Sequence, residues 1–246
     1  MNILKSLKAF ALIGAALSAH AHASVVISGT RIIFPAHERE VTIKITNEGK
    51  TPALIQTWLD KGSANESPDK IDVPFILTPS MFRMEPGKGQ TLRLIYSKEP
   101  LPADKESLFW LNVLEIPPKA AANDDRNKVQ MAFRSRIKVM FRPDGLPGSA
   151  ATAHKQVKWE VVREQGKYAL KATNPTPYVV NFGSVALTSG DTKYDARMGF
   201  VLPGSTKLFP IDGLTFVPAG DAKVDFSTID DWGASRDGQQ PVSDHE

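Results

Sequence analysis

The chain has 246 residues and no cysteine, with 30 lysine and arginine residues against 27 aspartate and glutamate residues. Without Lys5 and Lys8, which lie in the first 23 residues, the balance is 28 against 27, too even for general attraction to nucleic acid. With no disulfides available, the fold must depend on a core built from its hydrophobic residues, 41% of the total.

Residues 1–23 have the features of an export signal. Lys5 and Lys8 supply a positive charge, residues 9–17 are apolar but too few to span a bilayer, and Ala21-His22-Ala23 fits the small-x-small pattern that precedes a cleavage point. No later stretch approaches the ~20 apolar residues of a transmembrane helix. The sequence therefore predicts a cleavable signal peptide at 1–23 and a soluble, exported mature chain that starts at Ser24.

Short runs rich in Val, Ile, Thr and Phe follow, bounded by Gly, Pro, Asn and Asp. In the clearest run, REVTIKIT at 39–46, apolar residues alternate with threonine and lysine, as in a strand with one buried face. No segment has a convincing helical period. Seven or so such strands predict an all-β antiparallel sandwich of immunoglobulin type. The predicted strands lie in 25–34, 39–60, 74–80, 81–97 and 107–118.

The stretch 128–143, KVQMAFRSRIKVMFRP, predicts an unusually long strand with one apolar and one basic side. Strands typically run to roughly 5 or 6 residues. This strand is therefore expected either to bend or to extend beyond the sheet that covers it, which leaves open what covers its first apolar residues. The apolar side chains of one parity are Val129, Met131, Phe133, Ile137, Val139 and Phe141.

A second domain is predicted after this strand. Residues 144–154 are rich in Gly, Pro and Ala, as in a linker, and β-rich runs resume at 157–162, 168–173 and 177–187 and end near 225–232. Two sandwiches in tandem follow, which we place at 24–146 and 147–246. The polar tail from residue 233 is expected to fray.

Patterns that indicate catalysis or metal binding are weak. His37, His154 and His245 are isolated in the sequence, so neither a histidine metal site nor a Ser-His-Asp triad is predicted. The glycine-rich stretch 87–91 lacks the spacing of a phosphate-binding loop and leads into a strand pattern, which favours a hairpin turn. The sequence predicts a protein that is not an enzyme and that needs no cofactor.

The stretch 101–118, LPADKESLFWLNVLEIPP, resembles the conserved motif of periplasmic pilus-assembly chaperones. The matching positions are Glu106-Ser107, Phe109, Trp110, Asn112 and Ile116-Pro117-Pro118; supporting matches over nearly the whole mature chain are Gly29-Thr30-Arg31, 136–143, 174–178 and 229–233. This resemblance implies two immunoglobulin-like domains set at an angle. It also implies a periplasmic chaperone that binds fimbrial (pilin) subunits and delivers them to an outer-membrane usher.

Chaperones of this kind lend the edge strand that ends their first domain to a subunit that lacks its own final strand. By position, the lent strand is 128–141, and the resemblance implies that Val129, Met131 and Phe133 enter the subunit's groove. We expect Ile137, Val139 and Phe141 to face the chain's own core. The alternative is that Val129, Met131 and Phe133 line that core as well.

The resemblance also assigns charged residues. Arg31 and Lys138 correspond to the pair that binds the terminal carboxylate of the subunit in the cleft between domains, where the alternative is ordinary solvated charge. Glu106, Arg142 and Asp231 correspond to an ionic link between the domains, for which we expect an orienting role rather than a large net stabilisation.

The sequence leaves several features of the protein undecided. Thr78-Pro79-Ser80 replaces the Thr-Pro-Pro often found in the family, so a cis bond before Pro79 is undecided. The short loop 119–128, without a cysteine pair, resembles the short-loop group that serves rod-like fimbriae. A self-polymerising or adhesive surface protein, and a sandwich-fold hydrolase or carbohydrate binder, are the alternatives. Pairing of the free protein with itself to hide its strand is not decided.

Overall fold

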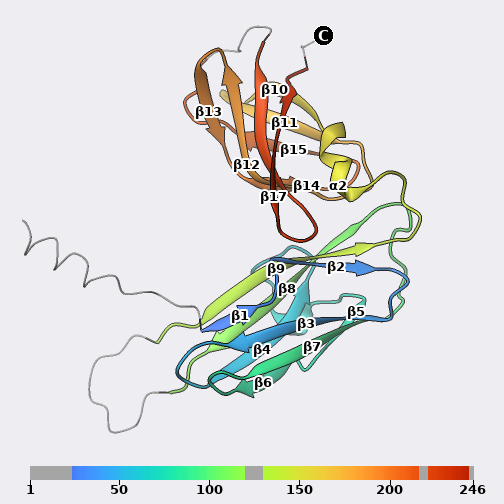
Figure 1. Cartoon of the computed structure of the whole chain (residues 1–246), viewed down its shortest axis with the longest axis vertical. Helices are drawn as coiled ribbons and strands as arrows, with labels where there is room; N and C mark the ends of the chain where they lie inside the picture. The colour runs from blue at the N-terminus through green and yellow to red at the C-terminus, as the bar shows by residue number, and fades with distance from the viewer. Residues whose placement is uncertain (1–23, 120–129, 216–220, 244–246) are drawn as a thin grey trace, which may run out of the picture.

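The computed structural model describes residues 24–119, 130–215 and 221–243. Two β-sandwiches follow each other along the chain, and Figure 1 shows them one above the other with their strands inclined to each other. The prediction of an all-β chain with two tandem sandwich domains set at an angle is confirmed. No helix in these ranges is long and apolar enough to cross a membrane. The exact boundary between residues 146 and 147 stays a prediction.

The first domain contains two facing sheets, of strand order β1-β3-β7-β5 and β2-β9-β8-β4-β6. All pairings are antiparallel except that of β2 with β9. The chain thus changes sheets within its first predicted strand, because β1 pairs with β3 while β2 pairs with β9. The elements are β1 (Val25–Ile27), β2 (Arg31–Pro35), β3 (Glu40–Asn47), β4 (Ala53–Asp60), η1 (Pro68–Lys70), β5 (Phe75–Thr78), β6 (Met81–Met84), β7 (Gly89–Tyr96), β8 (Ser107–Ile116) and β9 (Phe133–Arg142).

The core of the first domain lies between these sheets and is rich in aromatic rings. Phe75 contacts the rings of Phe34, Phe109 and Phe141 with centroids 5.0–6.1 Å apart. Such edge-on contacts add specific geometry to the burial of large apolar side chains. Phe141 and Val139 are buried, as expected. The core therefore fixes the second half of β9 in its sheet.

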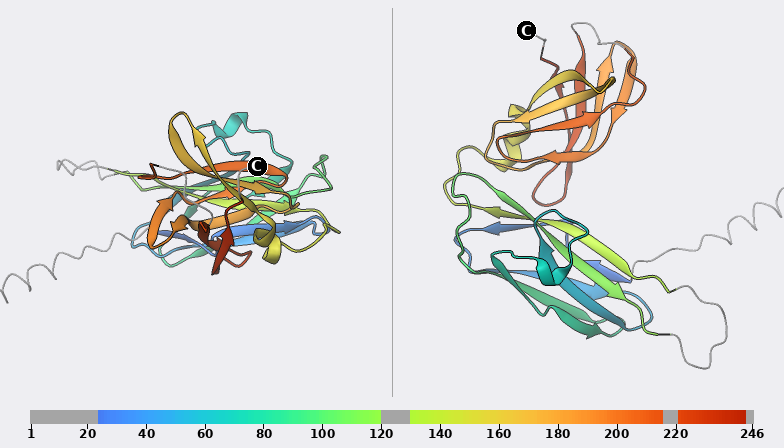
Figure 2. Two further views of the ribbon diagram at one scale, coloured as in Figure 1. Left: turned by 90° about the horizontal axis from the view of Figure 1, so that it is seen from above. Right: turned by 180° about the vertical axis from the view of Figure 1, so that it is seen from behind.

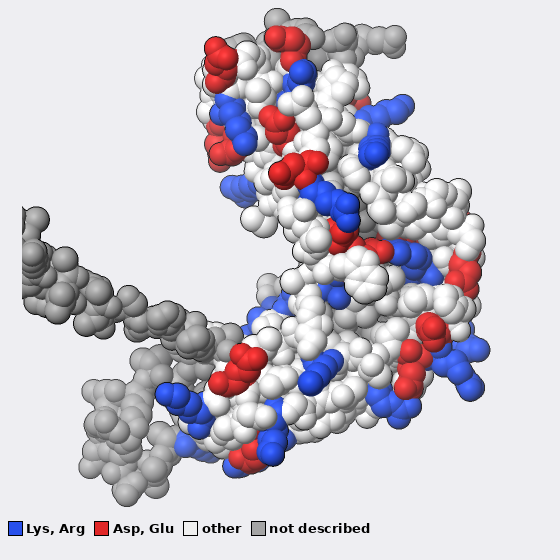
Figure 3. Space-filling model, viewed as in Figure 1, with Lys and Arg blue, Asp and Glu red and all other residues white. Residues whose placement is uncertain are grey.

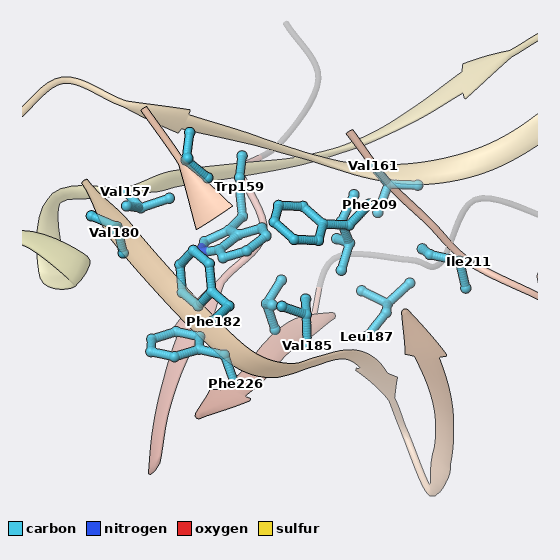
Figure 4. Close-up of a cluster of buried hydrophobic side chains, with 14 of the residues drawn as sticks. Val157, Trp159, Val161, Val180, Phe182, Val185, Leu187, Phe209, Ile211 and Phe226 are labelled. Carbon is cyan, nitrogen blue, oxygen red and sulfur yellow. The ribbon is translucent and has the colours of Figure 1, made fainter. Parts of the chain in front are cut away.

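The second domain packs a three-stranded sheet, β10-β11-β15, against a sheet of order β13-β12-β16-β17 in which β14 also pairs with β12. Its core surrounds the fully buried Trp159, whose ring lies against Phe182, Phe209 and Phe226 (Figure 4). The elements are α2 (Ala150–Ala153), η2 (His154–Gln156), β10 (Lys158–Glu164), β11 (Lys167–Asn174), β12 (Val180–Ser189), β13 (Thr192–Ala196), β14 (Gly199–Val201), β15 (Ser205–Pro210), β16 (Lys223–Ile229) and β17 (Ser235–Pro241).

The prediction that the polar tail from residue 233 is frayed is wrong for residues 235–241. Residues 235–241 form β17, which pairs with β16 along seven residues. The strand reads as polar because it is the edge of the sheet, yet its side chains have partners: Trp159 Nε1 donates to Gln240 Oε1 at 2.9 Å, and Gln239 Nε2 donates to Asp225 Oδ1 at 2.7 Å. Backbone pairing and these bonds hold a segment that composition alone assigned to solvent.

Other differences are smaller. The predicted linker 144–154 contains the short helix α2, with Ala153 packed into the core of the second domain. Strands β13, β14 and β15 lie outside the predicted runs, because β14 has only three residues and the sequences of β13 and β15 contain few apolar residues. The peptide bond before Pro79, left open by the sequence, is cis.

Candidate interdomain binding site

Strand β9 is only half covered along one of its edges. On one side, β8 pairs with β9 from Phe133 to Phe141. On the other side, β2 pairs with β9 only from Lys138 to Arg142. Within the described residues, the stretch 133–137 therefore has backbone groups without a strand partner on that edge. Such an edge is a template for another strand.

The side chains at this half-covered end are exposed. Met131 and Phe133 have 60% and 51% of their surface exposed, so the alternative that they line the domain's own core is wrong. Val129, the third residue of the predicted set, lies outside the described residues. Ile137 is half-buried and packs against the core. The regular strand begins at Phe133 and is thus shorter than the predicted 128–143.

The opposite, basic face of β9 is fixed by residues from the neighbouring strands. Arg136 donates to both carboxylate oxygens of the buried Asp60, to Oδ2 from Nε at 3.0 Å. Asn112 Nδ2 donates to Asp60 at 2.7 Å, and the guanidinium of Arg136 lies 4.2 Å from the ring centroid of Trp110. Burial would raise the pKa of Asp60, but the bonds from Arg136 and Asn112 hold it below its ordinary value. The side chains on this face have little freedom.

Three side chains form a row across the first domain's sheet, at the end that faces the second domain. Lys138 lies opposite Arg31 in the β2–β9 pairing and opposite Trp110 in the β8–β9 pairing. Cross-strand neighbours point to the same face of a sheet. The register of three strands thus places two cations and one indole side by side.

In the part of the second domain that the structure describes, Lys138 contacts neutral groups. Its Nζ donates to Asn181 Oδ1 at 2.5 Å and lies 4.4 Å from the ring centroid of Phe200. Burial, with a smaller contribution from the positive charge of Arg31, lowers the pKa of Lys138 from 10.5 to about 8. The ammonium is therefore a poorly hydrated charge in a narrow space between the domains.

Among the described residues, Arg31 likewise forms no ion pair with a carboxylate. Its Nη1 donates to the backbone carbonyl of Ile229 at 2.9 Å, while its Nε is buried with no hydrogen-bond partner in the structure. Burial lowers the pKa of Arg31, and the carboxylates of Asp231 and Asp230 oppose this shift. None of the ion pairs in the described ranges includes Arg31 or Lys138. Two adjacent, incompletely satisfied cations make this a candidate site for an anion.

Arg142 joins the two domains through the predicted ionic link with Glu106 and Asp231. Its Nε donates to Glu106 Oε1 at 2.6 Å, and its Nη1 and Nη2 donate to the two carboxylate oxygens of Asp231 at 2.7 and 2.9 Å. Glu106 also accepts from the backbone N–H of Val179 at 2.7 Å. Burial raises the pKa of the Glu106 carboxyl, and Arg142 beside it opposes this. The structure brings the three predicted residues together at the domain junction.

The turn between β16 and β17, which carries Asp231, points at the first domain in the views of Figures 1 and 2. A cavity of about 540 Å³ lies beside it, lined by residues that include Thr30, Arg31, Ile33 and Trp232. Trp232 is 94% exposed. Acidic and basic side chains meet at the waist between the domains in Figure 3. The junction is thus charged and open to solvent on this side.

Sequence reasoning missed the partners supplied by the second domain. Asn181 and Phe200 have no motif of their own. The only signal for Asn181 is that it is a polar residue inside the apolar run PYVVNFGSVAL, where a buried side chain needs a hydrogen-bond partner. Sequence reasoning likewise placed Asp60 in a strand pattern and Arg136 at the start of the matching stretch 136–143, but gave neither a role in the site.

Known proteins resemble the chain along nearly its whole length. Residues 24–147 match the family model described as pili and flagellar-assembly chaperone, PapD N-terminal domain, and residues 152–240 match pili assembly chaperone PapD, C-terminal domain. The chain is 41% identical over 226 residues to the probable fimbrial chaperone YadV of Escherichia coli K12, with 91% of this chain and 92% of YadV covered.

Solved structures agree. A crystal structure of the YadV chaperone matches with a TM-score of 0.77 at 37% identity, covering 89% of this chain and 100% of the other. A structure of Salmonella enterica SafA pilin in complex with the SafB chaperone matches with a TM-score of 0.73 at 25% identity, covering 91% and 99%. The two sandwiches of this chain are therefore tandem immunoglobulin-like domains, and the chain belongs to the PapD family of pilus-assembly chaperones.

Proposed function

We propose that this protein is a periplasmic chaperone that binds a pilin subunit by lending it the first part of β9, with Arg31 and Lys138 holding the subunit's terminal carboxylate. The family match and the resemblance to a chaperone bound to a pilin support the class of partner. Export through the signal peptide at 1–23 and delivery to an outer-membrane usher complete the proposal.

The half-covered edge of β9 is the observation that carries this function. Residues 133–137 leave backbone groups unpaired, and the same stretch of chain exposes Met131 and Phe133. A soluble protein normally blunts such an edge with charge, proline or a covering loop. An apolar, unpaired edge instead suits a partner that adds its own strands and supplies pockets for alternate side chains.

The two parts of the site lie on one strand, which gives the binding mode a register. Phe133 and Lys138 are five residues apart on β9, roughly 17 Å in an extended strand. A chain end bound at Lys138 and Arg31 therefore fixes which subunit residues pair with Phe133. Alternation alone leaves a strand free to slip by two residues, and an anchored terminus removes that freedom.

The exposed residues also suggest how the free protein behaves. Burying a side chain the size of methionine or phenylalanine is worth roughly 1.5–3 kcal/mol, and both are exposed here. We propose that two copies cover this edge for each other when no subunit is present.

Co-expression with a fimbrial subunit that the protein binds tests the proposal. Arg31→Ala and Lys138→Ala should each reduce the recovered subunit at least tenfold while the chaperone stays folded by circular dichroism. Lys44→Ala is the matched control, because Lys44 is an exposed lysine on β3 in the other sheet. Recovery equal to that of the control would refute the anchoring role.

A further inference from the structure

Two half-buried cations at the domain junction, Arg142 and Lys138, have partners of opposite kinds. Arg142 is neutralised by two carboxylates, Glu106 and Asp231. Lys138 instead meets an amide oxygen of Asn181 and the aromatic face of Phe200. A neutral partner fixes the position of an ammonium without cancelling its charge, whereas a carboxylate does both. The difference bears on which cation stays available to a ligand.

Asn181 is itself held in place. It is buried, and its Nδ2 lies within reach of the backbone carbonyl of Val179 at 3.5 Å and of Met140 Sδ at 3.8 Å. The N–H of Val179 is bound by Glu106 of the first domain. The ionic link between the domains therefore also fixes the short stretch of chain that carries Asn181, so the amide oxygen meets Lys138 at a set position.

Phe200 comes from the strand next to Asn181. The two residues are register partners in the pairing of β14 with β12, so both side chains stand on the same face of the second domain's sheet. Phe200 also contacts Trp110 of the first domain, with ring centroids 5.9 Å apart. The Lys138 ammonium lies against both rings, 5.6 Å from the centroid of Trp110. Two domains thus contribute to one cage around a single charge.

We propose that Asn181 and Phe200 are positioning residues for Lys138, by which the second domain holds the ammonium beside Arg31 while leaving its charge free for the carboxylate of a bound subunit. This inference rests on the proposed function, since it explains how the anion site stays charged. It assigns to the second domain a part in the site beyond setting the angle between the domains.

Substitutions of Asn181 separate positioning from simple packing. Asn181→Asp keeps the shape but places a negative charge against Lys138, so the cation is neutralised internally. Asn181→Leu keeps similar volume but removes the hydrogen bond. A role in packing alone predicts that leucine, which fills a similar volume, leaves the Lys138 pKa unchanged. The positioning role predicts opposite shifts of the Lys138 pKa, upward with aspartate and further below about 8 with leucine.

The primary measurement is the titration of Lys138 in the free, full mature protein, followed by the ¹³C shift of its Cε and assigned with Lys138→Met. Ser184→Asp adds the same charge at an exposed position on β12 and serves as the control. We expect a shift up in Asn181→Asp, a shift down in Asn181→Leu and none in the control. Unchanged titration in Asn181→Leu, or shifts of both variants in one direction, would overturn the inference.

Subunit recovery by co-expression gives the second readout. Asn181→Asp should lose the subunit as fully as Lys138→Ala, and Phe200→Leu should reduce recovery several-fold. If Arg31→Ala and Lys138→Ala retain the subunit, the proposed function fails. If those two variants lose it while Asn181→Asp retains it, the function stands and the role of Asn181 is refuted.

Discussion

Lys138 and Arg31 are direct neighbours in the parallel pairing of β9 with β2, so two positive charges face the second domain side by side. Like charges at opposed strand positions are destabilising. Both side chains are also partly desolvated, which lowers the pKa of each. The fold thus holds a pair of cations that an anion would stabilise, an arrangement that serves binding at the expense of stability.

The desolvation of the Lys138 charge predicts how the stability of the protein depends on pH. The pKa of Lys138 is about 8 in the folded protein and 10.5 in the ordinary state. Between those values the unfolded chain binds the proton and the folded chain does not, so the free energy of unfolding should rise with pH across this window. A lowering of this size corresponds to about 3 kcal/mol. Urea unfolding from pH 7 to 10.5 measures the rise.

Lys138→Met supplies the reference for that measurement. Without the buried charge, the variant should be more stable than the natural protein at pH 7, and the difference should shrink as the pH passes 8. Parallel stability curves for the two proteins would show that Lys138 carries no such cost.

The exposed end of β9 predicts a variant that binds poorly but folds well. Met131→Asp places an unpaired charge where an apolar groove is expected, and should weaken subunit binding by roughly 2 kcal/mol or more, about thirtyfold. Because Met131 is 60% exposed, the free energy of unfolding should change by no more than about 0.5 kcal/mol. Binding is measured by calorimetry, with a denatured subunit that is diluted out of denaturant into the chaperone.

Arg134→Ala controls for the change on the opposite face of the same strand. Arg134 lies on the opposite parity from Met131, and its Nη1 donates to the backbone carbonyl of Ala64. The two variants should differ at least tenfold in affinity. Equal affinities would mean that the apolar parity of β9 does not enter the subunit.

The ionic link predicts a rescue. Arg142→Met leaves the fully buried Glu106 carboxylate without its cation, and should lower the free energy of unfolding by roughly 3–5 kcal/mol. Adding Glu106→Gln removes the uncompensated charge and should restore most of that loss. Arg93→Met breaks an exposed pair with Glu40 and should cost less than about 1 kcal/mol. A double variant no more stable than Arg142→Met would contradict this account of the link.

Much of the fold follows from local patterns. Alternation in REVTIKIT and in 128–143 predicts the strands observed as β3 and β9, because a half-buried strand needs one apolar face. The same reasoning fails for β17, whose residues are polar on both faces and which is held by pairing with β16 and by Trp159. The sequence of β17 alone does not indicate that Gln240 accepts a hydrogen bond from the indole of Trp159, which lies far away along the chain.

The site divides in a similar way. The resemblance to pilus-assembly chaperones led to all five charged residues of the predicted site, which are Arg31, Glu106, Lys138, Arg142 and Asp231. Asn181 and Phe200 could not be found so, because they act through contact with Lys138 across the domain junction. Residues that matter only through a partner far along the chain become visible when the tertiary structure brings the two together.

The most direct test of the central claim is a crystal structure of this chaperone bound to its pilin subunit. The account predicts that residues 131–137 pair as a strand with the subunit, that Met131 and Phe133 enter its groove, and that Arg31 and Lys138 bind its terminal carboxylate. A complex in which the subunit pairs elsewhere, with Met131 and Phe133 left in solvent, would contradict it.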